Sequence, residues 1–525
     1  MRCHIAETIC PIRGFDSLRS STCDWPAAST SGGCGPRSSP AAQHTGHGAL
    51  LPQPPPPPFR TETGKLVERF AWRQLDFAYP DAQSRQNALR TGDFIPENNL
   101  PVGIEVWGDK LFVTVPRWRQ GIPATLNYIP LSTASPDSPQ LIPYPDWETN
   151  REGNCNGLTT VYRIKADACD RLWVLDVGTV GYDNTTENVC PYSINVYDLH
   201  TNRRLRRYQL RPDDTNSDTF IANIAVDIGA SCDDTFMYAS DELGYGLVIY
   251  SWEQNTSWRV THPFFLPDPL RGDFNIAGMN FQWWSEGVFG MALTPPQEDG
   301  FRVLLFHPLA SHREFAVSTR VLRDRSLVDS NFHYFQNLGE RGPNGHVTAQ
   351  YMGDDGILFF NLIDQNAIGC WDGRKHYRPH NMAVVDKDDE ALVFPSDVKV
   401  DRAGNLWVMS DRMPVFLLAE LDYSDVNFRI FSGPVSTAIA GTPCDPSVGE
   451  FSGPPLVSRF QEDGAARYTQ DLYQRQPFGT FDQPLPSYGK WTLPLSSSRS
   501  PYVAPSPRLQ HPRFGAPTAV GHFTL

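Results

Sequence analysis

Short apolar segments recur at long intervals through the middle of the chain. Each is flanked by polar residues of the kind that bound β-strands. Roughly 50 to 70 residues separate neighbouring segments, somewhat more than the unit of the commonest propeller repeats. The six segments are residues 111–113, 172–174, 236–238, 288–290, 357–359 and 406–408.

Another strand precedes each apolar segment across a turn rich in Asp, Gly or Asn, and this pattern predicts a β-hairpin. A further strand pair usually follows, as in residues 193–210. Each unit is therefore expected to hold about four antiparallel strands, with the apolar segment as its second strand. Six such units predict an all-β fold, a six-bladed β-propeller. Two stacked sandwich domains are the alternative.

Two of the units are similar enough to align, residues 165–176 (KADACDRLWVLD) and 398–411 (VKVDRAGNLWVMSD). Trp173 and Trp407 occupy equivalent positions in this alignment. An aromatic residue repeated at the same strand position is typical of packing between sheets. We expect both tryptophans in the core.

Composition changes sharply at both ends of the chain. Residues 1–64 are rich in Pro, Ser and Gly and include the proline run 54–58, so we expect a disordered extension. Residues 451–525 are again Pro/Ser-rich and are expected to be a disordered tail. The propeller is assigned to residues 65–450. We find no apolar signal-peptide core in residues 1–18, and no run approaches the roughly 18 apolar residues of a membrane span.

The charge balance narrows the class of partner. The 525 residues include 45 Lys+Arg and 59 Asp+Glu, which gives a net charge of −14. A nucleic-acid partner is not expected, because such binding needs a basic face. A hydrophobic fraction of 40% with 12% aromatic residues is sufficient for a large core. Oligomeric state is left open.

Six cysteines fall in the repeat region without a CxxC pair or a Cys/His cluster at zinc spacing, so no metal or cofactor is assigned. An even number suits disulfides in an oxidising compartment, although buried free thiols are the alternative. Sequons at Asn184 and Asn255 lie in predicted loops and add weight to a secreted glycoprotein. Sequence alone does not fix the connectivity. The pairing we suggest is Cys155–Cys190, Cys169–Cys232 and Cys370–Cys444.

Familiar catalytic signatures such as GxSxG, HExxH and Walker A are missing, and the catalytic residues are unknown. Polar residues at strand ends offer another lead, because the second strands of all blades end on one face of a propeller. Arg117 and Trp118 follow the first unit at the same face, and we find no histidine at an equivalent strand end. Acidic and amide groups that converge on a channel can bind a cation, an organic amine or a metal ion. The alternative is that these Asp and Asn residues only cap backbone groups at the strand ends. The candidate channel residues are Asp176, Asn223, Asp241, Asn361, Asp397 and Asp411.

Several long segments resemble the yellow/major royal jelly protein family of insects. Among them are NLPVGIEVWGDKLFVTVPRWRQGIPATLNYIP, CDRLWVLDVGTVG, FFLPDPLRGDFNIAGMNFQW and LWVMSDRMPVFLLAELDYSDVNFRI. The resemblance runs from about residue 65 to about residue 444 and includes both sequons. It implies a secreted six-bladed propeller that controls cuticle pigmentation and promotes black melanin patterning. Family members begin with a signal peptide where this chain has an unrelated extension, and we favour a wrongly assigned first exon.

Two hypotheses of function follow from the resemblance, because some paralogues speed dopachrome conversion and a salivary branch binds biogenic amines in the channel. The first is a non-enzymatic protein that binds catecholamine or melanin precursors or acts among cuticle matrix components. The second is a dopachrome-converting isomerase or decarboxylase, which would need acid–base groups tuned by burial. We favour binding and leave enzymatic activity open. A third, weaker alternative is a metal-dependent, lactonase-like hydrolase using Asn223 and Asp397.

Overall fold

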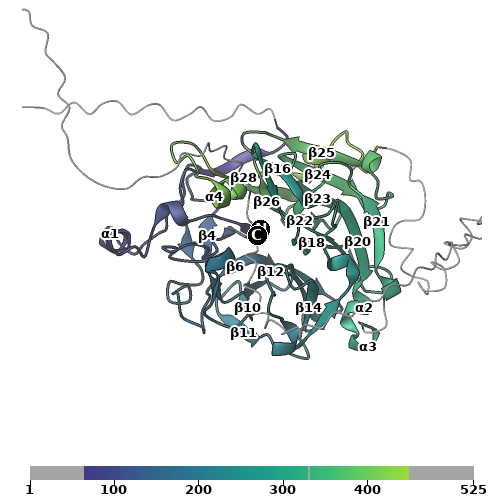
Figure 1. Ribbon diagram of the computed structural model, residues 1–525, viewed down its shortest axis with the longest axis horizontal. Coiled ribbons are helices and arrows are strands. Elements are labelled where there is room, and N and C mark those ends of the chain that lie inside the picture. Colours follow the sequence, from purple (N-terminus) through teal and green to yellow (C-terminus); the bar gives the residue numbers. More distant parts are fainter. Residues whose placement is uncertain (1–63, 329–331, 449–525) are drawn as a thin grey trace, which may run out of the picture. The chain divides into compact units, whose positions relative to one another are not determined.

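The computed structural model describes residues 64–328 and 332–448. Six four-stranded antiparallel sheets stand around a central axis (Figure 1). The innermost strand of each sheet contacts the innermost strands of both neighbouring sheets, which closes a ring. The predicted six-bladed propeller is therefore confirmed over two stacked sandwiches. The predicted disordered segments 1–64 and 451–525 lie, apart from Gly64, outside the described residues.

The blades follow the order of the chain, each written here from its innermost to its outermost strand. Blade 1 contains β2 (Gly103–Trp107), β3 (Lys110–Thr114), β4 (Leu126–Pro130) and β5 (Ile142–Pro143). Blade 2 contains β6 (Val161–Ala166), β7 (Arg171–Asp176), β10 (Ser193–Asp198) and β11 (Arg204–Gln209). Blade 3 contains β12 (Ile221–Ile228), β13 (Thr235–Asp241), β14 (Gly246–Ser251) and β15 (Thr256–Thr261).

Blade 4 contains β18 (Val288–Leu293), β19 (Val303–Pro308), β20 (Arg313–Ser318) and β21 (Gln336–Glu340). Blade 5 contains β22 (Val347–Met352), β23 (Ile357–Leu362), β24 (Ala367–Asp372) and β25 (Met382–Lys387). Blade 6 contains β26 (Pro395–Val400), β27 (Asn405–Ser410), β28 (Phe428–Pro434) and β1 (Val67–Trp72).

The connections carry two small hairpins and short helices. The hairpins are β8 (Thr179–Val180) with β9 (Glu187–Asn188), and β16 (Asp273–Ile276) with β17 (Met279–Gln282). The α-helices are α1 (Ala82–Thr91), α2 (Thr319–Arg323), α3 (Arg325–Val328), α4 (Met413–Leu418) and α5 (Val435–Ile439). Single 3₁₀ turns occupy Pro96–Asn98, Asp183–Thr185, Pro212–Asp214, Pro263–Phe265, Phe332–Tyr334 and Pro379–Asn381. No helix in residues 64–328 or 332–448 is long and apolar enough to cross a membrane.

The sixth blade is closed by the two ends of the described chain. Strand β1 pairs with β28, with Trp72 opposite Phe428. The Lys65 ammonium also donates to the Ala438 carbonyl at 2.9 Å. Pairing the first strand with the last sheet leaves no gap in the ring, which protects sheet edges that would otherwise be open.

One apolar segment, residues 288–290, was assigned to the wrong strand position. It lies in β18, the innermost strand of blade 4, whereas the second strand of this blade is β19. Both strands are almost completely buried because neighbouring sheets cover both of their faces. Strands buried on both faces show the same unbroken apolar pattern, so sequence does not tell an innermost strand from a second strand.

The aligned tryptophans are core residues, as predicted. Trp173 is fully buried and Trp407 is 6% exposed. The indole N–H of Trp173 donates to Asp167 Oδ2 at 2.7 Å, and that of Trp407 donates to Asp401 Oδ2 at 2.8 Å. A buried indole N–H needs a hydrogen-bond acceptor. Both repeats therefore contain an aspartate as well as the tryptophan.

Three disulfides join the pairs suggested from the sequence. Cys155–Cys190 and Cys169–Cys232 have Cα separations of 5.3 and 6.0 Å, and Cys370–Cys444 has one of 6.1 Å. The second bridge links the β6–β7 turn of blade 2 to the β12–β13 turn of blade 3. The third ties β24 to the segment that follows α5.

Candidate functional site

The six innermost strands surround a channel that holds two cavities. We call the face at which β7 and β13 end the upper face. The lower cavity opens among the opposite ends of the innermost strands and has a volume of about 360 Å³. The upper cavity has a volume of only about 20 Å³. A site for a small organic molecule typically needs roughly 300 Å³ or more, so the lower cavity alone has that size.

Paired opposite charges line the lower cavity. The Lys165 ammonium lies 3.2 Å from Glu105 Oε2 and donates to the Tyr351 hydroxyl at 3.2 Å. The same ammonium stands 4.6 Å from the centre of the Tyr351 ring. Lys399 donates to Asp397 Oδ1 at 2.9 Å. The cavity therefore presents both an anion site and a cation site beside an aromatic ring.

Glu105 and Tyr351 keep Lys165 charged. Burial alone lowers the pKa of Lys165, but the Glu105 carboxylate and the Tyr351 hydroxyl outweigh it and raise the pKa above its ordinary value. Lys165 is thus a permanent cation inside the channel.

Arg163 separates the two cavities. Its guanidinium donates to two backbone carbonyl oxygens, that of Val102, which directly precedes β2, and that of Ser396, which lies in β26. Its Nε lies 3.7 Å from Asp397 Oδ1. Arg163 lines the upper cavity and Asp397 lines the lower cavity, so this ion pair lies between the two.

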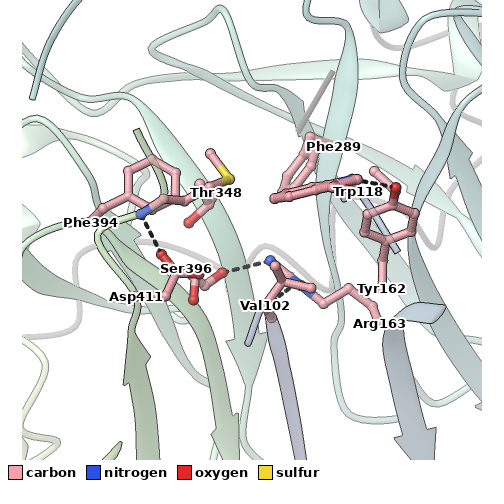
Figure 2. Close-up of a pocket in the computed structure, with 11 residues that line it drawn as sticks. Val102, Trp118, Tyr162, Arg163, Phe289, Thr348, Phe394, Ser396 and Asp411 are labelled. Atoms are coloured by element: carbon pink, nitrogen blue, oxygen red, sulfur yellow. Dashed lines mark hydrogen bonds between the residues drawn. The ribbon is translucent and has the colours of Figure 1, made fainter. Parts of the chain in front are cut away.

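Aromatic residues form much of the wall of the upper cavity. Figure 2 shows Trp118, Tyr162 and Phe289 on one side of it, and Phe394 and Asp411 on the other. The indole N–H of Trp118 donates to the Tyr162 hydroxyl at 2.7 Å. About 20 Å³ is enough for one water molecule, so a larger ligand would have to displace side chains.

Asp411 is the titratable carboxyl group of the upper cavity. Its Oδ1 accepts the Met413 amide at 3.0 Å, whereas its Oδ2 has no hydrogen-bond partner in the part of the chain that the structure describes. Burial raises the pKa of Asp411 to about 7. A carboxyl group with this pKa exchanges its proton near neutral pH, which general acid–base catalysis requires.

The structure divides the six candidate channel residues into two groups. Asn223 and Asp397 line the lower cavity, and Asp411 lines the upper cavity. Asp176, Asp241 and Asn361 line neither of these cavities.

Turn chemistry explains two of the three that do not face these cavities. Asp176 Oδ1 accepts the amides of Thr159 and Thr160 at 3.0 and 2.8 Å. Asp241 accepts the Phe220 amide at 2.9 Å and the Arg259 guanidinium at 2.6 Å. These carboxylates satisfy backbone donors at the start of the neighbouring strand, as Asp does at many strand ends.

Arg117 does not serve the channel either. It is 2% exposed, and its guanidinium donates to several backbone carbonyls, among them those of Ile122 and Leu158 at 3.2 and 3.3 Å. Burial lowers the pKa of Arg117 to about 10. Arg117 holds a loop together and lines neither of the two cavities. Trp118 does line the upper cavity.

Sequence reasoning missed the residues that give the lower cavity its charge. Alternate residues of a strand point to the same side, so Lys165 follows Arg163 toward the channel and Lys399 follows Asp397. Charged residues at every second position of an otherwise apolar strand could have identified these lysines from the sequence. They were missed because only the strand ends were considered.

A buried acidic pair was also missed. Glu242 directly follows β13 and Glu286 precedes β18, and both are at most 1% exposed. Burial, and then Glu286, raises the pKa of Glu242 well above its usual value, while burial raises the pKa of Glu286 to about 8. Two adjacent buried carboxyl groups cannot both ionise cheaply, so the pair retains protons at neutral pH.

A histidine does occupy an equivalent strand end, contrary to the sequence analysis. His307 is the penultimate residue of β19, the position that Asn361 holds in β23. Its Nδ1 lies 3.1 Å from Glu314 Oε2, and the side chain is fully buried. The residue was overlooked because residues 288–290 were taken for the second strand of this blade. His307 lines neither cavity.

Comparisons with known proteins give the family of this chain. The profile described as "Major royal jelly protein" matches residues 159–444. "Protein yellow" of Drosophila pseudoobscura pseudoobscura is 60% identical over 396 residues, which cover 75% of this chain and 71% of the relative. The chain belongs to the major royal jelly protein family. "Protein yellow" of Drosophila erecta is 58% identical over 414 residues, covering 78% and 76% of the two chains. The family resemblance drawn from the sequence is confirmed.

A solved structure gives a much weaker match. A virginiamycin B lyase from Staphylococcus aureus shares 12% identity, with a TM-score of 0.35 over 64% of this chain and 96% of the lyase. At this distance the match carries no argument about function. The three disulfides of this royal-jelly-family propeller are typical of an extracellular protein.

Proposed function

We propose that this protein acts in the cuticle and promotes black melanin patterning by binding a melanin precursor in the lower cavity. The observation that carries the proposal is the volume of about 360 Å³ combined with paired opposite charges on its wall. The volume suits a single-ring molecule. The family resemblance supplies the physiological setting, which is pigment formation among cuticle matrix components.

The chemistry of the wall fits a catechol amine or amino acid. The carboxylates of Glu105 and Asp397 can attract an ammonium group, and Lys165 and Lys399 can attract a carboxylate. The Tyr351 ring offers an aromatic surface for a catechol. The charged groups of the wall already pair with one another. A zwitterion such as dopa would replace these pairs, its ammonium group binding a wall carboxylate and its carboxylate binding a lysine. A simple cation such as dopamine would satisfy only the carboxylates, and we therefore expect dopa to bind more tightly.

The test is a calorimetric titration of the purified secreted protein with dopamine and with dopa. Saturable binding of one ligand per chain is expected. Tyr351→Phe removes the hydroxyl beside Lys165 and should weaken binding roughly fivefold, which corresponds to about 1 kcal/mol for one hydrogen bond. Tyr423→Phe is the matched control, because its hydroxyl donates to Glu97 outside the cavity. Absence of saturable binding by the unmodified protein would refute the proposal.

The alternative function is dopachrome conversion at the upper cavity. The observation that favours it is Asp411, whose unpartnered Oδ2 and pKa of about 7 suit a general acid or base. Faster loss of dopachrome absorbance than with heat-denatured protein would make the protein an enzyme. Asp411→Asn should then lower the rate at least about 100-fold. Ligand binding without turnover would support the binding protein instead.

A further inference from the structure

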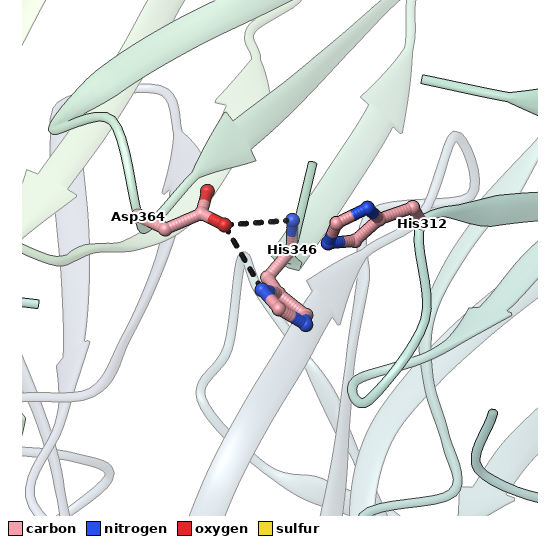
Figure 3. Close-up of side chains that lie close together, drawn as sticks. All are labelled: His312, His346 and Asp364. Carbon is pink, nitrogen blue, oxygen red and sulfur yellow. Dashed lines mark hydrogen bonds and ion pairs between the residues drawn. The ribbon is translucent and has the colours of Figure 1, made fainter. Parts of the chain in front are cut away.

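Two histidines and an aspartate meet on the upper face between blades 4 and 5. His312 lies in the turn between β19 and β20, His346 directly precedes β22, and Asp364 follows β23. One ligand atom from each lies within 4.8 Å of the other two (Figure 3). Their spacing along the chain matches no zinc motif, so only the packing of two blades brings them together.

His312 is available to bind a cation. Its side chain is 6% exposed, and neither ring nitrogen makes a well-formed hydrogen bond within residues 64–328 and 332–448, although the Gly342 backbone interacts weakly with the ring. Burial, and then the neighbouring charges of His346 and Arg271, lowers the pKa of His312 to about 3. The ring is therefore neutral, with a free lone pair, under ordinary conditions. A buried polar group without a partner is costly, and a bound cation would remove that cost.

His346 and Asp364 are held as metal ligands usually are. His346 Nε2 lies 2.7 Å from the Arg271 carbonyl oxygen, and His346 Nδ1 lies 2.9 Å from Asp364 Oδ2. A histidine ligand commonly donates its second N–H to a backbone carbonyl, which fixes the ring and leaves the other nitrogen for the metal. The Phe274 ring stacks on His346 at a centroid distance of 4.0 Å and limits its rotation.

We propose that His312, His346 and Asp364 bind a divalent transition-metal ion such as Zn²⁺, with water completing the coordination. Imidazole and carboxylate are ligands that such ions prefer. Bonds of about 2.0–2.1 Å place tetrahedral ligands roughly 3.4 Å apart, so a pair of atoms 4.8 Å apart must close by about 1.4 Å, whereas His346 Nδ1 and Asp364 Oδ2, 2.9 Å apart, must open slightly. His312 can make most of this movement because its ring makes no well-formed hydrogen bond.

Two arginines, Arg341 and Arg271, lie near this position, and the Asp364 carboxylate is the group that favours a cation here. The Arg341 guanidinium is itself paired with Glu314 Oε2 at 2.8 Å. His346 Nδ1 and Asp364 Oδ2 face each other, so a metal ion can bind between these two atoms.

The test is a calorimetric titration of untagged, metal-stripped protein with Zn²⁺. We expect one ion per chain and a micromolar or tighter dissociation constant. Co²⁺ should give the strong visible absorption of a tetrahedral site. Unmodified protein that shows no saturable Zn²⁺ binding would overturn the proposal without any variant.

Two variants separate the site from incidental binding. His312→Phe keeps a ring in the buried position, and Asp364→Asn keeps the shape of the side chain if the first variant folds poorly. Either change should weaken Zn²⁺ binding at least about tenfold and abolish the Co²⁺ absorption. His380→Phe, at an exposed histidine, is the control and should bind as the unmodified protein does. Unchanged Zn²⁺ affinity in both cluster variants would show that the ion binds elsewhere. Neither outcome depends on dopamine or dopa binding.

Discussion

Replacing Glu286 by glutamine should stabilise the protein by an amount that grows with pH. The usual glutamate pKa is 4.5, whereas burial beside Glu242 raises that of Glu286 to about 8. Between these values the folded state holds a proton that the unfolded state has released, so the free energy of unfolding falls as the pH rises. In this window each pH unit lowers the free energy of unfolding of the unmodified protein by about 1.4 kcal/mol. The total loss reaches roughly 4–5 kcal/mol near pH 8.

Glutamine carries no titrating proton and has nearly the same shape. Glu286→Gln should therefore match the unmodified protein near pH 4.5 and exceed it by several kcal/mol at pH 8. Urea unfolding with the disulfides intact, measured at pH 5, 6.5 and 8, gives the difference directly. Glu420→Gln, at an exposed glutamate, is the control and should show only a small difference. A Glu286→Gln effect of the same size at pH 5 and pH 8 would refute the reasoning.

Two further changes test the loops around the blades. Arg117→Met leaves buried carbonyl groups without a donor and should lower the free energy of unfolding by about 2–4 kcal/mol in urea, whereas Arg151→Met, at an exposed arginine paired with Glu148, should cost less than about 1 kcal/mol. Equal losses in the two variants would contradict the role given to Arg117. Asn184→Gln and Asn255→Gln should each remove one glycan from the secreted protein, seen as a mass decrease, because both asparagines are exposed. A protein whose mass does not change on enzymatic removal of N-glycans would contradict both assignments.

Much of the fold could be predicted because the signals are local. Apolar segments, the turns beside them and the Trp173/Trp407 repeat are properties of a few neighbouring residues. The assignment of residues 288–290 failed because β18 and β19 are buried equally on both faces. The pairing of β1 with β28 was not foreseen, since strands at opposite ends of the domain carry no local sign of their partner.

The candidate site was harder to predict than the fold. Asp411, Asn223 and Asp397 were found because polar strand ends are visible in sequence, but Asp176 and Asp241 share that pattern and instead accept backbone amides, with Arg259 also bound to Asp241. A carboxylate that faces a cavity and one that caps a loop look alike along the chain. The difference lies in which donors surround the side chain.

The sequence by itself determined the repeat, the number of blades, the family and the even set of cysteines, because each depends on residue types at short spacing. Only the tertiary structure decided which strands line the channel, how Lys165 meets Glu105, and which carboxyl groups pair. It also decided that His312, His346 and Asp364 share one buried point between two blades. Distances, burial and electrostatic coupling depend on contacts between distant segments, and these exist only once the ring of blades has closed.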